Sequence, residues 1–153
     1  MMPFVSHRIP FGLNLWIAAR LMPVFARRPL DEILARATPG PGAQAYGGLS
    51  PLTIVAEVKR AVARPMRMRG RRCLREGLLA FHYLSLAGYR PILHFGLVPQ
   101  TITTQRPQAH CWVTVNEVTV INPPAGPMID LFAYDGSVAL ASKDATLARA
   151  TYD

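Results

Sequence analysis

Residues 69–90, RGRRCLREGLLAFHYLSLAGYR, place a cysteine at the start of an apolar helical pattern and a glycine at its end. The apolar side chains recur at helical spacing: Leu74, Leu78, Phe81 and Leu84. Gly88 is a typical C-cap, so the pattern predicts a helix from about residue 73 to residue 87. Two interpretations of Cys73 are then open. It is either an ordinary buried thiol or a nucleophile, since a helix N-terminus lowers the pKa of a thiol.

The residues before this helix predict further helices. Residues 14–37 follow a helical pattern, with a break or kink near Pro23 and a restart at 29–32. Residues 38–48 have the composition of a loop. Another helix is predicted at 51–63, with a serine as its N-cap and a proline in its first turn.

After Gly88 the apolar period changes to that of strands. Strands are predicted at 91–99, 109–115 and 118–122, followed by a short apolar segment at 128–134. The second and third strands form an antiparallel hairpin around Asn116 and Glu117. The fold class is therefore α+β, with helices first and a small antiparallel sheet behind the cysteine helix. We expect one domain over 1–153, with a helical part at 1–65 and a core at 66–135.

The chain has 153 residues and a formal net charge of +8, carried by 15 arginines and 2 lysines. Half of the residues are apolar, which excludes a disordered chain. A surplus of arginine suits nucleic acid, but no nucleic-acid-binding motif is present, so we expect no nucleic-acid partner. The arginines between residues 60 and 75 are either a solvated connector or an electropositive approach to Cys73.

The two cysteines, Cys73 and Cys111, follow neither a metal-binding spacing nor a disulfide framework. A reducing cytoplasm is therefore the expected compartment. The apolar stretch at 13–25 is too short to span a bilayer and contains Arg20 and Pro23. We expect a core or interface helix there, without stable membrane insertion.

A nucleophilic cysteine needs a nearby base, and His110 at the start of a strand is the best candidate. His82 lies on the cysteine helix itself, more than two turns beyond Cys73. His94 lies within an apolar strand, where a packed histidine is the simpler interpretation, and His7 lies in the N-terminal segment.

Two segments, RCLREGLLAFHYLSLAGYRPILHFGL (72–97) and QAHCWVTVNEVTVIN (108–122), resemble a known family. They are similar to the transglutaminase-like cysteine protease of lasso peptide biosynthesis, the B protein of the B2 type. The family has Cys-Leu-Arg opening a helix, a glycine ending it, a strand, and Ala-His-Ala-Trp leading into a hairpin. This chain has the same order: Cys73-Leu74-Arg75, Gly88 and Ala109-His110-Cys111-Trp112. The resemblance covers roughly residues 70–125.

The resemblance implies a papain-like core in which Cys73 attacks and His110 serves as base and then as acid. A third group orients His110, and the family usually has a carboxylate there. This chain has Asn122 at the matching position, with Asp130 as the alternative. The backbone N–H of Cys73 is the expected oxyanion donor, with Gln108 as a second candidate.

The hairpin register decides whether Asn122 can lie on the His110 face. With a two-residue turn, Cys111 would lie opposite Asn122, and His110 would lie on the other face of the sheet. A three-residue connection pairs Trp112 with Asn122 instead, so we predict a loop of odd length. By the same alternation Cys111 points into the core. Trp112 shares the His110 face, where it either shelters the site or is ordinary packing.

The function implied by the resemblance is cleavage of the leader peptide from a ribosomally made lasso precursor. The implied partners are that precursor, a separate leader-binding protein and an ATP-dependent cyclase that closes the macrolactam. No metal or organic cofactor is implied. Two alternatives remain: a catalytically silent member of the fold that binds a peptide or partner, and an acyl transferase using the same Cys-His pair.

Overall fold

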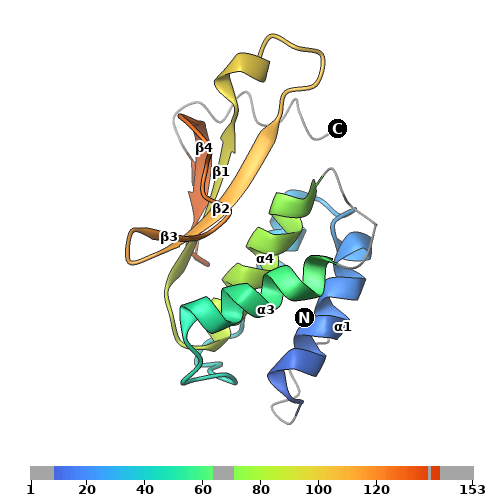
Figure 1. Cartoon of the computed structure of the whole chain (residues 1–153), viewed down its shortest axis with the longest axis vertical. Coiled ribbons are helices and arrows are strands. Elements are labelled where there is room, and N and C mark those ends of the chain that lie inside the picture. The colour runs from blue at the N-terminus through green and yellow to red at the C-terminus, as the bar shows by residue number, and fades with distance from the viewer. Residues whose placement is uncertain (1–8, 64–70, 138, 142–153) are drawn as a thin grey trace.

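The computed structural model of the chain describes residues 9–63, 71–137 and 139–141. The helices and strands within these ranges follow in chain order: α1 (Phe11–Phe25), α2 (Leu30–Ala37), α3 (Pro51–Ala63), α4 (Arg72–Leu86), β1 (Pro91–Leu97), the short 3₁₀ helix η2 (Pro99–Thr101), β2 (Ala109–Val115), β3 (Val118–Ile121), β4 (Ile129–Tyr134) and β5 (Ala139–Ala141). The helices gather beside one antiparallel sheet with the strand order β3-β2-β1-β4-β5 (Figure 1). The α+β fold predicted from the sequence is confirmed.

The cysteine helix α4 is the centre of the hydrophobic core. Its side chains are buried along almost the whole helix, because α1, α2 and α3 pack around it and the sheet covers its remaining face (Figure 1). Gly77 lies where α4 meets the sheet. A Cβ atom there would lie 2.6 Å from Cys111 Sγ and 3.2 Å from a methyl group of Leu93. The glycine therefore allows α4 to pack closely against β1 and β2, despite its low helix propensity.

Of the break or kink predicted near Pro23, the break is wrong, since α1 continues through this proline to Phe25, whereas the restart predicted at 29–32 is confirmed by α2. Proline has no N–H, so the carbonyl of Ala19, four residues earlier, loses its helical partner. The guanidinium of the buried Arg75, from the first turns of α4, donates a hydrogen bond to that carbonyl. A donor from another helix therefore compensates for the proline and allows α1 to continue.

The hairpin loop of odd length is also wrong. Val115 pairs with Val118, which leaves a two-residue turn of Asn116 and Glu117, with φ angles of 49° and 65°. Positive φ at both positions is typical of the type I′ turn, whose twist matches that of the strands. The turn is not the only feature that sets the register, because the register shifts a second time between Val113 and Thr114.

A β-bulge produces this second shift. Thr114 pairs with Thr119 and Val113 pairs with Ile121, so Val120 is an extra residue in β3. Beyond this extra residue, the side chains of β3 alternate between the two faces of the sheet in the opposite order. Asn122 therefore lies at the level of Trp112, as it would with a loop of odd length. Asn122 therefore remains on the His110 side, although the turn has two residues.

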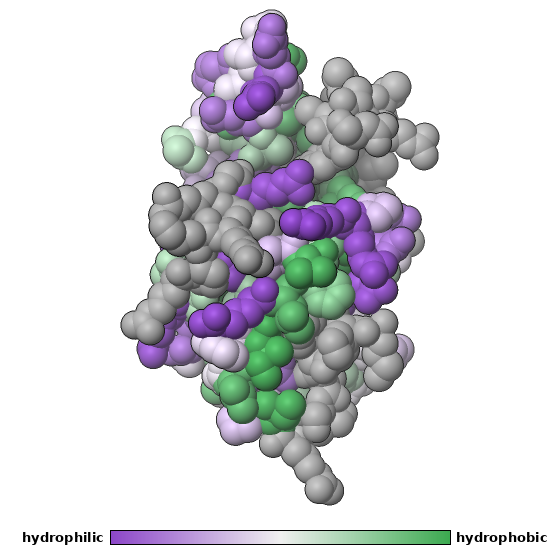
Figure 2. All heavy atoms as spheres, turned by 90° about the vertical axis from the view of Figure 1, so that its right-hand side faces the viewer, coloured by the Kyte–Doolittle hydropathy of each residue, from purple (hydrophilic) through white to green (hydrophobic). Residues whose placement is uncertain are grey.

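One face of α1 is apolar and exposed. Its large exposed side chains are between 38% and 64% accessible: Leu13, Trp16, Leu21 and Val24. Figure 2, which views the molecule from the α1 side, shows an apolar stripe with hydrophilic side chains beside it. The opposite face of α1 packs into the core, as expected for a core or interface helix. Within the described ranges, no helix is long and apolar enough to cross a membrane.

Candidate active site

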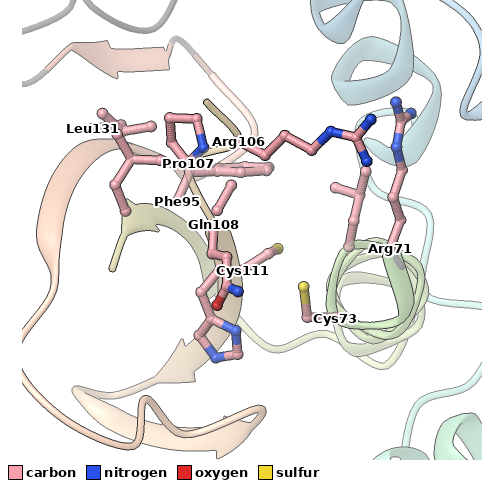
Figure 3. Close-up of a pocket in the computed structure, with 12 residues that line it drawn as sticks. Arg71, Cys73, Phe95, Arg106, Pro107, Gln108, Cys111 and Leu131 are labelled. Atoms are coloured by element: carbon pink, nitrogen blue, oxygen red, sulfur yellow. The ribbon is translucent and has the colours of Figure 1, made fainter. Parts of the chain in front are cut away.

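The thiol of Cys73 lies in the first turn of α4. Arg71 is the N-cap residue, and no side-chain hydrogen bond caps this end of the helix. The first backbone N–H groups of a helix lack intrahelical partners and carry the positive end of its dipole. Cys73 is half-buried, and its side chain projects into a pocket between α4 and the sheet (Figure 3). A half-buried thiol that lines a pocket is accessible to a substrate.

His110, the second residue of β2, lines the same pocket as Cys73. Its Nε2 atom lies 2.9 Å from the backbone carbonyl oxygen of Asn122. A carbonyl can only accept, so Nε2 carries the proton in this contact. In the neutral ring Nδ1 then has a free lone pair, and this nitrogen can accept a proton.

Asn122 connects the histidine to the cysteine. Its side-chain Nδ2 donates to the backbone carbonyl of Cys73 at 3.0 Å, while its own carbonyl accepts from His110. The backbone of Asn122 has a φ of 54°, in the left-handed region where asparagine is tolerated better than most residues. The three predicted residues therefore come together, but the carbonyl of Asn122, and not its side chain, contacts the imidazole.

Asp130, the alternative third residue, lies elsewhere. It is exposed on β4, which is separated from β2 by β1, and it pairs with Gly96. Its carboxylate raises the pKa of His94 and so opposes the larger effect of burial, which lowers that pKa. Asp130 therefore acts on His94, and the contact with His110 is made by Asn122.

The sequence did not reveal the ring stack beside His110. The Trp112 ring lies parallel to His94, with centroids 5.2 Å apart, and stacks on His110 at 6.1 Å. A Cβ atom on Gly96 would lie 3.2 Å from the Trp112 ring, which is closer than ordinary van der Waals contact, so glycine lets the indole lie against β1 without displacement. His94 also lies 2.9 Å from Thr114, through Nε2 and Oγ1. The stack restricts the plane of the His110 ring.

The other cysteine and the helical histidine lie in the core. Cys111 is buried against Gly77, and burial, together with the nearby Cys73 thiol, raises its pKa. His82 is buried, its Nδ1 donates to the carbonyl of Ala37 at 2.9 Å, and burial lowers its pKa. The packed interpretations of Cys111 and His94 agree with their contacts. His7 and the arginines at 64, 67 and 69 lie outside the described residues.

The pocket between α4 and the sheet has a volume of about 490 Å³. Besides Cys73 and His110 it is lined by polar and charged side chains, namely Arg71, Arg106 and Gln108, and by apolar ones such as Leu74 and Leu97. Across the described residues, no group of three or more histidine, cysteine or acidic side chains is placed to hold a metal ion. Arg71, Arg106 and Gln108 can donate hydrogen bonds from the pocket lining to a substrate.

Comparison with known families agrees with this geometry. The chain matches the family described as the Transglutaminase-like superfamily over residues 14–128. The chain belongs to the Transglutaminase-like superfamily. Searches of the curated proteins and of the solved structures found no match. Membership of the Transglutaminase-like superfamily indicates activity of the cysteine protease or acyltransferase type.

Proposed function

We propose that this protein is a cysteine protease that removes the leader peptide from a ribosomally synthesised lasso precursor. The proposal rests above all on one observation. Cys73 at an uncapped helix N-terminus and His110 line one pocket, and Asn122 bonds to both. Within the superfamily, the Cys-Leu-Arg and Ala-His-Cys-Trp segments resemble those of the lasso peptide protease, which is why we propose this particular activity. We expect the protein in the cytoplasm, where the thiol stays reduced.

In the proposed mechanism, Nδ1 of His110 takes the thiol proton and the Cys73 thiolate attacks the scissile carbonyl. The backbone N–H of Cys73 stabilises the oxyanion, and the Gln108 side chain is a second donor from the opposite wall. The imidazolium then protonates the leaving amine, which is the N-terminus of the core peptide. Water, deprotonated by His110, hydrolyses the thioester and releases the leader.

Asn122 is a positioning residue in this scheme. Its carbonyl holds the Nε2 proton of His110, which leaves Nδ1 available for the thiol and favours the imidazolium when it forms. Its side chain simultaneously ties β3 to the first turn of α4 through the Cys73 carbonyl. Asn122 therefore contributes to the relative position of base and nucleophile through both of these contacts.

The exposed apolar face of α1 supports the expectation that the protease works with other proteins. Contiguous apolar surface of this kind is typical of interaction sites. We propose that a separate leader-binding protein presents the precursor, and that an ATP-dependent cyclase uses the freed amine to form the macrolactam.

The test is conversion of a lasso precursor peptide in the presence of a leader-binding protein, followed by mass spectrometry. We expect Cys73→Ala to abolish formation of the leader fragment and Cys111→Ala, a control at the buried thiol, to retain it. Unchanged processing by Cys73→Ala would overturn the proposal.

The same experiment separates the alternatives. A silent binding module binds the precursor without cleaving it in any variant. An acyl transferase yields a leader amide instead of a leader acid when a primary amine is supplied.

A further inference from the structure

Two arginines lie in the pocket with Cys73. Arg71 immediately precedes α4, whereas Arg106 comes from the loop between η2 and β2. Figure 3 shows the Arg106 side chain reaching from the sheet side of the pocket toward Arg71 on the helix side. The two arginines therefore come from opposite walls of the pocket that Cys73 also lines, and the Arg106 guanidinium reaches toward that of Arg71.

The charge of these arginines is not neutralised by the pocket. Among the residues that the structure describes, the lining of the pocket includes no aspartate or glutamate. The ion pairs formed by arginines in the described ranges involve other residues, namely Arg28, Arg60 and Arg72. Arg71 donates one hydrogen bond to the carbonyl of Ala26 at 3.3 Å, which leaves most of its donors available. The uncapped start of α4 adds further positive potential.

We propose that this pocket binds a carboxylate of the substrate, so that the enzyme prefers peptides with aspartate or glutamate beside the scissile bond. Guanidinium groups bind carboxylates through paired, charge-assisted hydrogen bonds. An extended peptide advances about 3.3–3.6 Å per residue. A pocket of about 490 Å³ therefore places the carboxylate within about two residues of the cleaved bond. The peptide preference rests on the proposed protease function, but the carboxylate site itself can be tested without a substrate.

The first test uses iodoacetate and iodoacetamide, which differ by one negative charge. In both reactions the Cys73 thiolate forms a carbon–sulfur bond and displaces iodide. We expect the ratio of the iodoacetate rate to the iodoacetamide rate to be at least about fivefold higher at Cys73 than in N-acetylcysteine. The Cys73 peptide is quantified by mass spectrometry, and Cys111 contributes little because it is buried.

Arg106→Gln and Arg71→Gln should each lower this ratio about threefold or more, and 300 mM salt should lower it as well. Arg106 is exposed on a loop, so its substitution leaves the core intact. Arg90→Gln is the matched control, because Arg90 is exposed beyond the opposite end of α4 and about 20 Å away along the helix. An unchanged ratio in Arg106→Gln, or an equal fall in Arg90→Gln, would overturn the site.

The second test uses precursor peptides with a single glutamate or glutamine at each of the two positions on either side of the cleaved bond. We expect the wild type to cleave at least one glutamate peptide about tenfold faster than the matching glutamine peptide. The Arg106→Gln variant should cleave the two peptides of that pair at nearly equal rates. Equal cleavage of every pair would refute the preference and leave the protease function intact. No cleavage of any peptide would refute the protease function, and the alkylation ratio would still decide whether a carboxylate site exists.

Discussion

The buried guanidinium of Arg75 bonds to the carbonyl of Ala19, which Pro23 leaves without its helical partner. Arg71, the N-cap residue of α4, bonds to the carbonyl of Ala26, the C-cap residue of α1. Two arginines at the start of the cysteine helix thus satisfy two carbonyls of α1, one within the helix and one at its C-terminal end. These contacts position the N-terminus of α4, and with it Cys73, relative to the rest of the core.

Arg75→Met should lower the free energy of unfolding by about 3 kcal/mol, because it leaves the Ala19 carbonyl buried without a donor. Adding Pro23→Ala restores an N–H to that carbonyl, so the double variant should recover about 1 kcal/mol relative to additivity. Urea unfolding of both single variants and the double variant measures this coupling. Arg27→Met, at an exposed arginine, should change stability little, and strict additivity would show that the two sites are not coupled.

Gly77→Ala should destabilise the protein by about 1–3 kcal/mol, because its methyl group would overlap Cys111 Sγ at 2.6 Å. Cys111→Ala in the same chain removes the sulfur and should recover part of this loss. Gly12→Ala on α1 is the control, since a Cβ atom there meets nothing within 4 Å and alanine is the better helix former. Thermal unfolding of these three variants and the wild type measures these effects, and equal destabilisation at Gly12 and Gly77 would contradict the close packing of α4 on the sheet.

Asn122→Asp introduces the carboxylate that the lasso protease family usually has at this position, yet we expect it to reduce precursor processing. An aspartate cannot donate to the Cys73 carbonyl, and its charge would lie against that oxygen. Precursor processing should fall about tenfold or more, measured by mass spectrometry of the leader fragment. Asn122→Gly keeps both the positive φ and the carbonyl that binds His110, so it should retain more activity than Asn122→Asp. The reverse order would show that the side chain of residue 122 acts on His110 directly.

Burial lowers the pKa of His82, so the folded protein binds a proton at this site less readily than the unfolded chain does. Above the unfolded pKa of about 6.5 this site does not reduce the free energy of unfolding, because His82 is neutral in both states. As the pH falls from there toward the pKa in the folded protein, the free energy of unfolding decreases by up to about 1.4 kcal/mol per pH unit. Urea unfolding at pH 7 and pH 5 should show this loss, and His82→Gln should reduce it. An identical pH dependence in both proteins would show that His82 is not held neutral by burial.

The local elements followed closely from the sequence. The helix predicted from residue 73 to 87 is α4, and the strand predicted at 109–115 is β2 with the same bounds. These elements depend on periodicity, caps and turn residues within a few positions, and all of that information is local. The long strand expected at 91–99 ends at Leu97, because the 3₁₀ helix η2 begins two residues later.

The sequence alone determined that this chain is an α+β protein with a cysteine at the start of its central helix and a histidine at the start of a strand. Only the tertiary structure decided that a bulge at Val120 returns Asn122 to the site, and that the carbonyl of this residue binds His110. The same holds for the Arg75 bond to Ala19 and for the Trp112 ring lying over Gly96. These contacts join residues far apart in the chain or depend on a shift of one residue in register. They are determined by how the elements pack, for which no local sequence pattern provides a signal.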